Sequence, residues 1–393
     1  MNGVTVRHAK LEDACGLEQF YYRAYGERAR YKYPERWNWH FRDNPWRDND
    51  RLPVYVIEAP DGQIVGCTAS IRVPCKIFDN QIKLGWSVDT IVVPESRGMG
   101  AGKILQKINQ DDHPAFASLS MNAINRRIKL KLGAVLGPST KVYIKLLKFD
   151  LNVSILTPLY AFGYAIVRLL KSFKKSGNND IGHWKIDGPG HAVFSNAETE
   201  LWQKIRNRYD FAVERNADYL NWRYRDQPWT KYYCCRAYDA EGQLGGIAVY
   251  RIAEETGLKT AIITELMGIN SGDSSIFYTL LRSVEKNIVR LGGTQIQVAT
   301  SDQLIEDAIE QSGYLRIDLK NLVINGPKNI IGKINLQTTA MLTKGDQDLD
   351  QYPLAHYISP IGLIKKWIKV YSKQFVGNIR VSLENLPRNR KKV

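Results

Sequence analysis

A nine-residue motif that occurs twice constrains the architecture of this chain more than any other feature. The segment Asn38–Trp46 (NWHFRDNPW) returns as Asn221–Trp229 (NWRYRDQPW), with six of nine positions identical at an offset of 183 residues. A second landmark follows in the same order, since Asp61–Gly66 (DGQIVG) corresponds to Ala240–Gly245 (AEGQLG). Two matches in one order indicate a duplicated domain, with about 150 residues in each copy.

The first copy alternates strands and helices. Apolar runs bounded by turn residues predict strands, and a Pro-Asp-Gly turn joins two of them as a hairpin. Apolar residues at helical spacing follow the first strand and later turns. The expected elements are strand Val4–Arg7, a helix from Leu11, strands Val54–Ala59, Ile64–Val73, Leu84–Val93 and Ala115–Met121, and helix Asn122–Leu132 with Gly133 as its C-cap.

The segment Asp89–Leu105 combines a strand, a turn dense in glycine and the start of a helix. Gly98, Gly100 and Gly102 allow backbone N–H groups to converge on an anion without obstruction by Cβ atoms. The helix N-terminus adds about half a positive charge, and Arg97 can supply a charge-assisted hydrogen bond. The turn therefore predicts a phosphate cradle. It has neither the ending of a Walker loop nor the position and downstream acid of a dinucleotide-binding turn.

The segment Pro94–Gly102 (PESRGMGAG) resembles the acetyl-CoA loop of the GCN5-related N-acetyltransferases, whose pattern is Arg/Gln-x-x-Gly-x-Gly/Ala. The opening Thr5–Ala14 also resembles the first strand and helix of that family. The resemblance implies a mixed α/β fold with two tandem domains, each a mostly antiparallel, splayed sheet flanked by helices. It implies acetyl-CoA as co-substrate, no metal, and direct attack by an amine. The cofactor contacts that it implies are Val92, Val93, Arg97, Gly98, Met99, Gly100, Ala101, Gly102, Lys103 and Asn122.

A general base must take a proton from the incoming ammonium group. In the family that this loop resembles, an acidic residue five positions before the proline often serves, directly or through water. Asp89 holds that position and is the expected catalytic residue, with strand ordering or substrate binding as its alternative role. His40 is a second candidate base, and packing against Trp39 and Phe41 is its alternative role.

The general acid departs from the family pattern. The later helix of the family often carries a tyrosine that protonates the departing thiolate, within Asn-x-x-Ala-x-x-Leu-Tyr-x-x-x-Gly-Phe. Asn122 and Gly133 fit this pattern, but Lys129 stands at the tyrosine position and Ala134 replaces the aromatic residue. The general acid therefore stays open, with Tyr143 as another candidate.

The second copy has lost the cradle. Glu265 corresponds to Asp89, but the positions of the arginine and the three glycines are occupied by other residues in 273–278. Asp273 brings a negative charge to the place where phosphates would lie. We expect the second copy to bind no CoA and to complete the acceptor cleft, because pockets often form between domains.

The excess positive charge is concentrated in two segments. Of the net charge of +15, residues 141–179 contribute +6 and residues 353–393 contribute +8. The expected organisation is an N-terminal domain at 1–150 with the cofactor loop, a basic and hydrophobic linker at 151–190, a degenerate second domain at 191–350, and a basic amphipathic tail at 351–393.

Residues 151–175 and 361–375 suit an anionic membrane surface, because apolar residues adjoin lysines and arginines in both. Leu151–Val167 has seventeen uncharged residues, fewer than the roughly 20 that a spanning helix needs. A buried linker helix, an interfacial helix and a true span stay open for this segment. The alternative for the tail is a helix docked on its own domain.

Five cysteines without zinc-site spacing predict a reducing compartment and no metal site. The charged residues of Met1–Glu12 exclude a secretory signal there. We therefore expect a cytoplasmic protein that is peripheral at the inner membrane face.

The leading interpretation is a CoA-dependent N-acyltransferase that acts on a small-molecule primary amine, such as an amino sugar or a surface-polysaccharide precursor. One alternative is a transferase resembling the Fem enzymes, which use aminoacyl-tRNA. Another is a non-catalytic scaffold with this fold. Nucleic acid is not an expected partner, because the cofactor cradle is intact. The acceptor, the acyl chain length and the oligomeric state stay open.

Overall fold

The computed structural model describes residues 3–48, 51–97, 100–147, 184–255, 258–269 and 274–350. Gly98 and Met99 of the cradle lie outside the described residues, as do the predicted membrane segments 151–175 and 361–375, the tail 351–393 and most of the linker.

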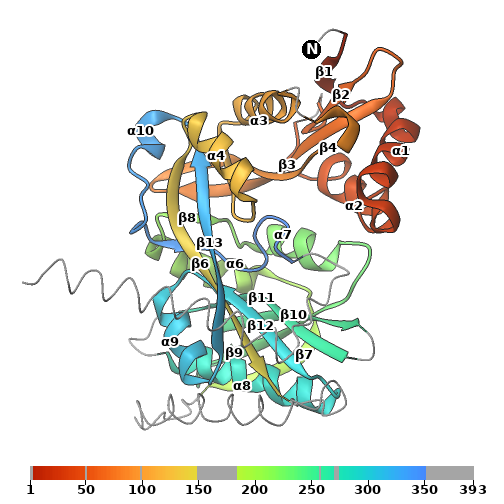
Figure 1. Cartoon of the computed structure of the whole chain (residues 1–393). Helices are drawn as coiled ribbons and strands as arrows, with labels where there is room; N and C mark the ends of the chain where they lie inside the picture. Colours follow the sequence, from red (N-terminus) through yellow and green to blue (C-terminus); the bar gives the residue numbers. More distant parts are fainter. Residues whose placement is uncertain are drawn as a thin grey trace, which may run out of the picture.

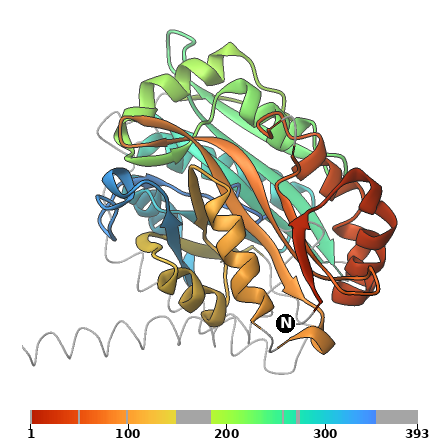
Figure 2. The same cartoon turned by 90° about the horizontal axis from the view of Figure 1, so that it is seen from above.

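The first half contains a small antiparallel sheet region with helices on its faces. Helix α3 packs against β2, β3 and β4, as the view from above also shows (Figure 2). The elements of the first half are β1 (Thr5–His8), η1 (Leu11–Asp13), α1 (Ala14–Tyr25), η2 (Gly26–Tyr31), α2 (Glu35–Trp37), η3 (Asn38–Arg42), β2 (Val54–Glu58), β3 (Ile64–Ile77), β4 (Asn80–Val92), η4 (Pro94–Ser96), α3 (Ala101–Asp111), β5 (Ala115–Ser118), α4 (Ala123–Lys131) and β6 (Val135–Leu146).

The second half repeats this order of strands and helices. Helix α8 packs against β7, β9, β10 and β11, in the same way as α3 in the first half. The elements of the second half are β7 (Lys185–His191), α6 (Asn196–Ile205), η6 (Arg206–Arg208), β8 (Phe211–Val213), α7 (Ala217–Leu220), η7 (Asn221–Arg225), β9 (Tyr232–Tyr238), β10 (Leu244–Glu255), β11 (Leu258–Gly268), α8 (Ser275–Arg290), β12 (Gln295–Thr300), α9 (Gln303–Gln311), β13 (Leu315–Asn325), α10 (Lys328–Ile331) and β14 (Ala340–Met341).

The two halves exchange their last long strands. Strand β6 of the first half pairs with β12 of the second, and β13 of the second half pairs with β5 of the first. The two exchanged strands also pair with each other, from Leu315 opposite Ile144 to Ile324 opposite Val135. They run side by side from one half to the other (Figure 1). The described strands therefore form one continuous sheet, in the order β1-β2-β3-β4-β5-β13-β6-β12-β11-β10-β9-β7, with β8 and β14 attached beside β3.

The predicted mixed α/β fold with flanking helices is confirmed. The hairpin β2–β3 lies where the sequence predicted it, and Asn122 caps α4 by accepting a hydrogen bond from the Asn125 N–H at 2.8 Å. Gly133 has the positive φ, 92°, that suits a helix C-cap. The strand exchange was not predicted, because the sequence pattern of each half predicts the same strands whether they pair within one half or between the two. The domain boundaries stay predictions.

The repeated motif forms a second contact between the halves, in addition to the exchanged strands. Trp39 and Trp222 stack with their ring centroids 4.7 Å apart. Trp39 meets Trp229 edge-on at 5.1 Å, and Trp222 meets Trp46 edge-on at 5.1 Å, so each copy makes the same contacts with the other. The indole N–H of Trp39 also donates to the Trp222 carbonyl at 3.1 Å. The motif recurs because both copies pack on a pseudo-twofold axis, which accounts for its aromatic residues without a ligand.

We expect Trp222→Ala to lower the free energy of unfolding by about 3–5 kcal/mol, because it removes a large buried ring from this contact. Urea unfolding followed by circular dichroism measures the change. Tyr22→Ala is the control, because Tyr22 is 47% exposed and its loss should cost below about 0.5 kcal/mol. Equal effects of the two changes would contradict the assignment of this contact.

Candidate active site

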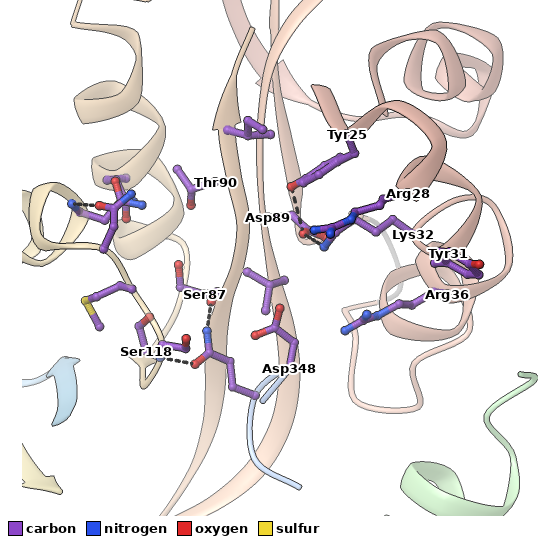
Figure 3. Close-up of a pocket in the computed structure, with 18 of the residues that line it drawn as sticks. Tyr25, Arg28, Tyr31, Lys32, Arg36, Ser87, Asp89, Thr90, Ser118 and Asp348 are labelled. Atoms are coloured by element: carbon purple, nitrogen blue, oxygen red, sulfur yellow. Dashed lines mark hydrogen bonds and ion pairs between the residues drawn. The ribbon is translucent and has the colours of Figure 1, made fainter. Parts of the chain in front are cut away.

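A cavity of about 670 Å³ opens where strands β4 and β5 separate. The two parallel strands pair only at Leu84–Trp86, opposite residues 115–117, and then diverge. Residues of α4 line one side of the cavity, and the segment that follows α1 lines the other. Strand β4 lies between these two walls (Figure 3). The cavity is therefore built around a split in the sheet.

Gln347, from the second half, bridges this split. Its Oε1 accepts hydrogen bonds from the backbone N–H groups of Leu119 at 2.8 Å and Ser120 at 3.1 Å, and its Nε2 donates to the Ser87 carbonyl at 2.6 Å. Buried backbone groups need a partner, and these lose their neighbouring strand where β4 and β5 diverge. Gln347 replaces the missing backbone ladder and fixes the width of the cleft.

The glycine turn leads into the N-terminus of α3. Gly100 is the N-cap residue, and its left-handed backbone with φ 76° favours glycine. A Cβ atom at Gly100 or Gly102 would meet no protein atom within 4 Å, so the turn faces open space. The first N–H groups of a helix have no intrahelical partner and can bind an anion there. Ala101 packs inward, whereas Lys103 is exposed beside the turn.

The other predicted cofactor contacts differ in the hydrogen-bond donors that they can offer to a cofactor. The exposed Arg97 donates from Nε to the Val92 carbonyl at 3.0 Å, so its terminal nitrogens stay available. Val93 is fully buried, and its N–H donates to the Val65 carbonyl at 3.0 Å, which leaves no backbone donor for a cofactor. Asn122 lines the cavity at the start of α4.

Asp89 reaches the cavity from a bulge in β4. Its backbone is left-handed, with φ 50°, where the register between β3 and β4 shifts. Its carboxylate forms an ion pair with Lys32 and accepts a hydrogen bond from the Tyr25 hydroxyl at 3.3 Å (Figure 3). Burial raises the pKa of Asp89, but the charges of Lys32 and Arg36 and the two hydrogen bonds bring it below its ordinary value. A carboxylate held in this ionised form is a weak base.

Asp348 is a second carboxylate in the cavity, and it comes from the second half. It is 9% exposed, and the side chain of Arg36 points toward it from the opposite wall (Figure 3). Burial raises its pKa, and the nearby charge of Asp89 adds to this effect. The charges of Arg36 and Lys32 only partly offset the rise. Asp348 therefore holds a proton more readily than Asp89 does.

Lys129 lies on α4 and lines the cavity. Its side chain is 2% exposed, donates from Nζ to the Ser87 hydroxyl at 3.0 Å and lies 4.0 Å from the centre of the Phe116 ring. Burial lowers the pKa of Lys129 to about 7. This ammonium group can release a proton near neutral pH, as a general acid must.

The other two residues that the sequence suggested for proton transfer do not line the cavity. His40 is buried among Trp39 and Phe41, and burial, with the charges of Arg36 and Arg223, lowers its pKa well below the ordinary value. Tyr143 lies in the core of the second half and donates to Glu310 at 3.2 Å.

The second half contains a counterpart of the Asp89 pair, and its side chains are fully buried. Glu265 accepts a hydrogen bond from Tyr224 at 2.8 Å and lies 3.6 Å from Arg215, which also pairs with Asp346 at 2.7 Å. A Cβ atom at Gly345 would lie 2.0 Å from the Tyr224 hydroxyl and 2.6 Å from Glu265 Oε1, so the backbone at Gly345 packs directly against this cluster.

As expected, the second half completes the cavity of the first. It contributes Gln347, Asp348 and the exposed Glu254. The sequence did not identify the cavity residues Tyr25, Lys32, Arg36, Gln347 and Asp348. One signal was present for Lys32, because Arg215 follows it at the offset of 183 residues that relates the tryptophan motifs.

The comparisons with known proteins find the same fold in solved structures. No family model matches the sequence, and no curated protein matches it significantly. A GCN5-related N-acetyltransferase from Anabaena variabilis is similar with a TM-score of 0.55 at 13% identity, over 84% of this chain and 73% of that one. Saccharomyces cerevisiae N-myristoyltransferase, solved with bound myristoyl-CoA, is similar with a TM-score of 0.51 at 10% identity, over 82% and 83% of the chains.

A protein of unknown function from Enterococcus faecalis, described as a probable N-acyltransferase, is similar with a TM-score of 0.51 at 12% identity, over 84% of this chain and 73% of that one. The chain therefore has the fold of the GCN5-related N-acetyltransferases, with a split between two central strands that forms a cavity.

Two further observations concern the described part of the chain. It contains no group of three or more His, Cys, Asp and Glu side chains that could hold a metal ion. It also contains no helix that combines the length and the apolar character needed to cross a bilayer.

We expect Lys129→Met to stabilise the protein at pH 6 by several kcal/mol more than it does at pH 10. The folded state lowers the pKa of Lys129 to about 7, whereas the unfolded chain keeps it at about 10.4. Between these values the unfolded chain binds more protons, so wild-type stability rises with pH by at most about 1.4 kcal/mol per unit from this group. Urea unfolding of both proteins at the two pH values measures the difference, and equal differences would show that Lys129 is not desolvated.

Proposed function

We propose that this protein transfers an acyl group from acyl-CoA to a primary amine. The observation that carries the proposal is helix α3, which begins at the open glycine turn and lines the cavity of the split sheet with Gln106. A pyrophosphate needs converging N–H donors, and a thioester arm needs a slot between strands. Helix α3 joins these two features.

The residues of the cradle suit the parts of CoA. The first-turn N–H groups of α3 and the terminal nitrogens of Arg97 would hold the pyrophosphate. Gln106 is 1% exposed and lines the cavity, and neither of its side-chain amide atoms has a partner in the described structure. A buried amide without a partner is costly, and the amide groups of the pantetheine arm would satisfy it.

The polar lining of the cavity favours a short acyl group such as acetyl. Lys129, Ser87 and Ser118 line it, and a long alkyl chain beside them would remove them from water without offering hydrogen bonds. Acetyl-CoA is therefore the proposed donor. An amino sugar or a surface-polysaccharide precursor is the proposed kind of acceptor.

Asp348 is the proposed general base. Its raised pKa allows it to take one proton from the ammonium group of the acceptor, which frees the nitrogen lone pair. Asp89 would act beside it by fixing Lys32 and the shape of the wall, because its own carboxylate is engaged by that lysine. Asp89 stays a candidate for a direct catalytic role.

Lys129 is the proposed general acid. The thioester supplies an activated carbonyl carbon, and the new C–N bond forms as the C–S bond breaks. The ammonium group of Lys129 gives a proton to the departing sulfur. As the amide forms, the acceptor nitrogen loses its second proton, which returns to the amine of Lys129. The products are an amide and CoA with a free thiol, with one proton released overall.

We expect Gly102→Glu to weaken acetyl-CoA binding at least tenfold, because a carboxylate would project into the open space of the cradle. Gly102→Ala is the matched control, since its Cβ meets no atom within 4 Å. Calorimetric titration of acetyl-CoA measures both. Absence of binding to the folded wild type would overturn the proposed function, and binding without turnover on any amine would favour a scaffold.

We expect Asp348→Asn to lower kcat/KM for transfer by about 10²–10⁴-fold, the usual contribution of a general base. The wild-type rate should rise with pH as Asp348 ionises, at a pH above the ordinary range of an aspartate, and the variant should lose this dependence. Asp89→Asn should keep the acidic limb. Thiol release between pH 4 and 9 measures all three proteins, and a lost limb in Asp89→Asn alone would assign the base to Asp89.

A further inference from the structure

Three basic residues form one wall of the cavity at positions four apart in sequence. Arg28, Lys32 and Arg36 all line it, and all three side chains extend from the segment after α1 toward β4 (Figure 3). Within the part of the chain that the structure describes, Lys32 alone of the three forms an ion pair, and its partner is Asp89. The wall lies opposite the α4 side of the cavity, and the cradle at the start of α3 is a separate feature.

Arg36 is the informative member of this wall because it is buried. It is only 8% exposed. Within the described residues, no carboxylate lies within the 4.0 Å of an ion pair, and no group accepts a hydrogen bond from its guanidinium. Its guanidinium lies 6.0 Å from the centre of the Trp229 ring, and its charge acts at longer range on the carboxylates of Asp89 and Asp348. A guanidinium has five N–H donors, and removing them from water is costly unless an anion replaces it.

An amine that enters this cavity as a cation would meet Arg28 and Arg36, and their charges would repel it. The carboxylates of the cavity lie among these cations, since Asp89 pairs with Lys32 and Arg36 points toward Asp348 (Figure 3). Glu254 of the second half is a further carboxylate of the lining. The cavity thus places carboxylates that can bind an ammonium group beside two guanidinium groups that form no ion pair in the described structure.

We propose that the acceptor is an amine that also carries an acidic group, a carboxylate or a phosphate, and that Arg36 binds this group together with Arg28. The planar fork of an arginine binds either oxyanion through two parallel hydrogen bonds. This inference rests on the proposed function and narrows its substrate class. It accounts for a buried arginine beside a site that handles ammonium groups.

The test uses pairs of amines that differ only in the acidic group. Glucosamine 6-phosphate is paired with glucosamine, and glycine with glycinamide, so that the two pairs separate phosphate from carboxylate. Calorimetric titration into the full chain saturated with CoA measures affinity, and thiol release from acetyl-CoA measures transfer. We expect the acidic member of at least one pair to bind at least tenfold more tightly.

Variants separate Arg36 from general electrostatics. Arg36→Gln should reduce the preference to within about threefold by weakening only the acidic member, in keeping with the usual strength of hydrogen bonds to charged groups. Arg28→Gln, at an exposed position, tests the same site if the buried change prevents folding. Arg42→Gln is the control, because Arg42 is exposed and paired with Asp43 outside this cavity.

The outcomes distinguish the two proposals. Equal affinity for both members of each pair, or binding of neither, overturns the acidic-acceptor inference even if acetyl-CoA binds and amines are acylated. An unchanged preference in both Arg36→Gln and Arg28→Gln also overturns it. Failure of acetyl-CoA to bind the wild type overturns the proposed function itself.

Discussion

The pairing of β6 with β13 is the constraint on which the rest of the molecule depends. Because each of these strands begins in one half and ends in the other, neither half can complete its sheet without its partner. The exchange also directs the chain after β13 back toward the first half, where β14 pairs with β8 and β8 pairs with β3. Only then does the chain reach Gln347 and Asp348, so two residues of the cavity depend on the order of strands in the whole sheet.

The surrounding packing fixes the ionisable side chains of the cavity in place and, because it buries them, disfavours their charged forms. Burial disfavours the ammonium of Lys129 and the carboxylate of Asp348, and both pKa values move toward neutrality from opposite sides. Each group is costly to the folded state and is supported by the surrounding sheet. Such costs are characteristic of sites that handle protons, and they separate this cavity from the solvated charges elsewhere on the surface.

The sequence predicted the parts of the fold that depend on local patterns. The strand–turn–helix at Gly100, the hairpin β2–β3 and the C-cap of α4 at Gly133 all follow from residues close together in the chain. The replacement of tyrosine by Lys129 was also visible, although its burial was not. The contribution of Asp348 was not visible, because the residue lies more than two hundred positions from β4 and reaches it through the exchanged strands. Arg36 was missed for a related reason, since only burial distinguishes it from any surface arginine.

The buried cluster of the second half has a consequence for the cavity of the first. The segment that places Gly345 against Tyr224 continues directly into Gln347 and Asp348, which line that cavity. One short segment therefore encloses the ionic cluster of the second half and completes the lining of the first. A change that moved residue 345 away from Tyr224 would also displace Gln347 and Asp348, so the core of one half positions the cavity of the other.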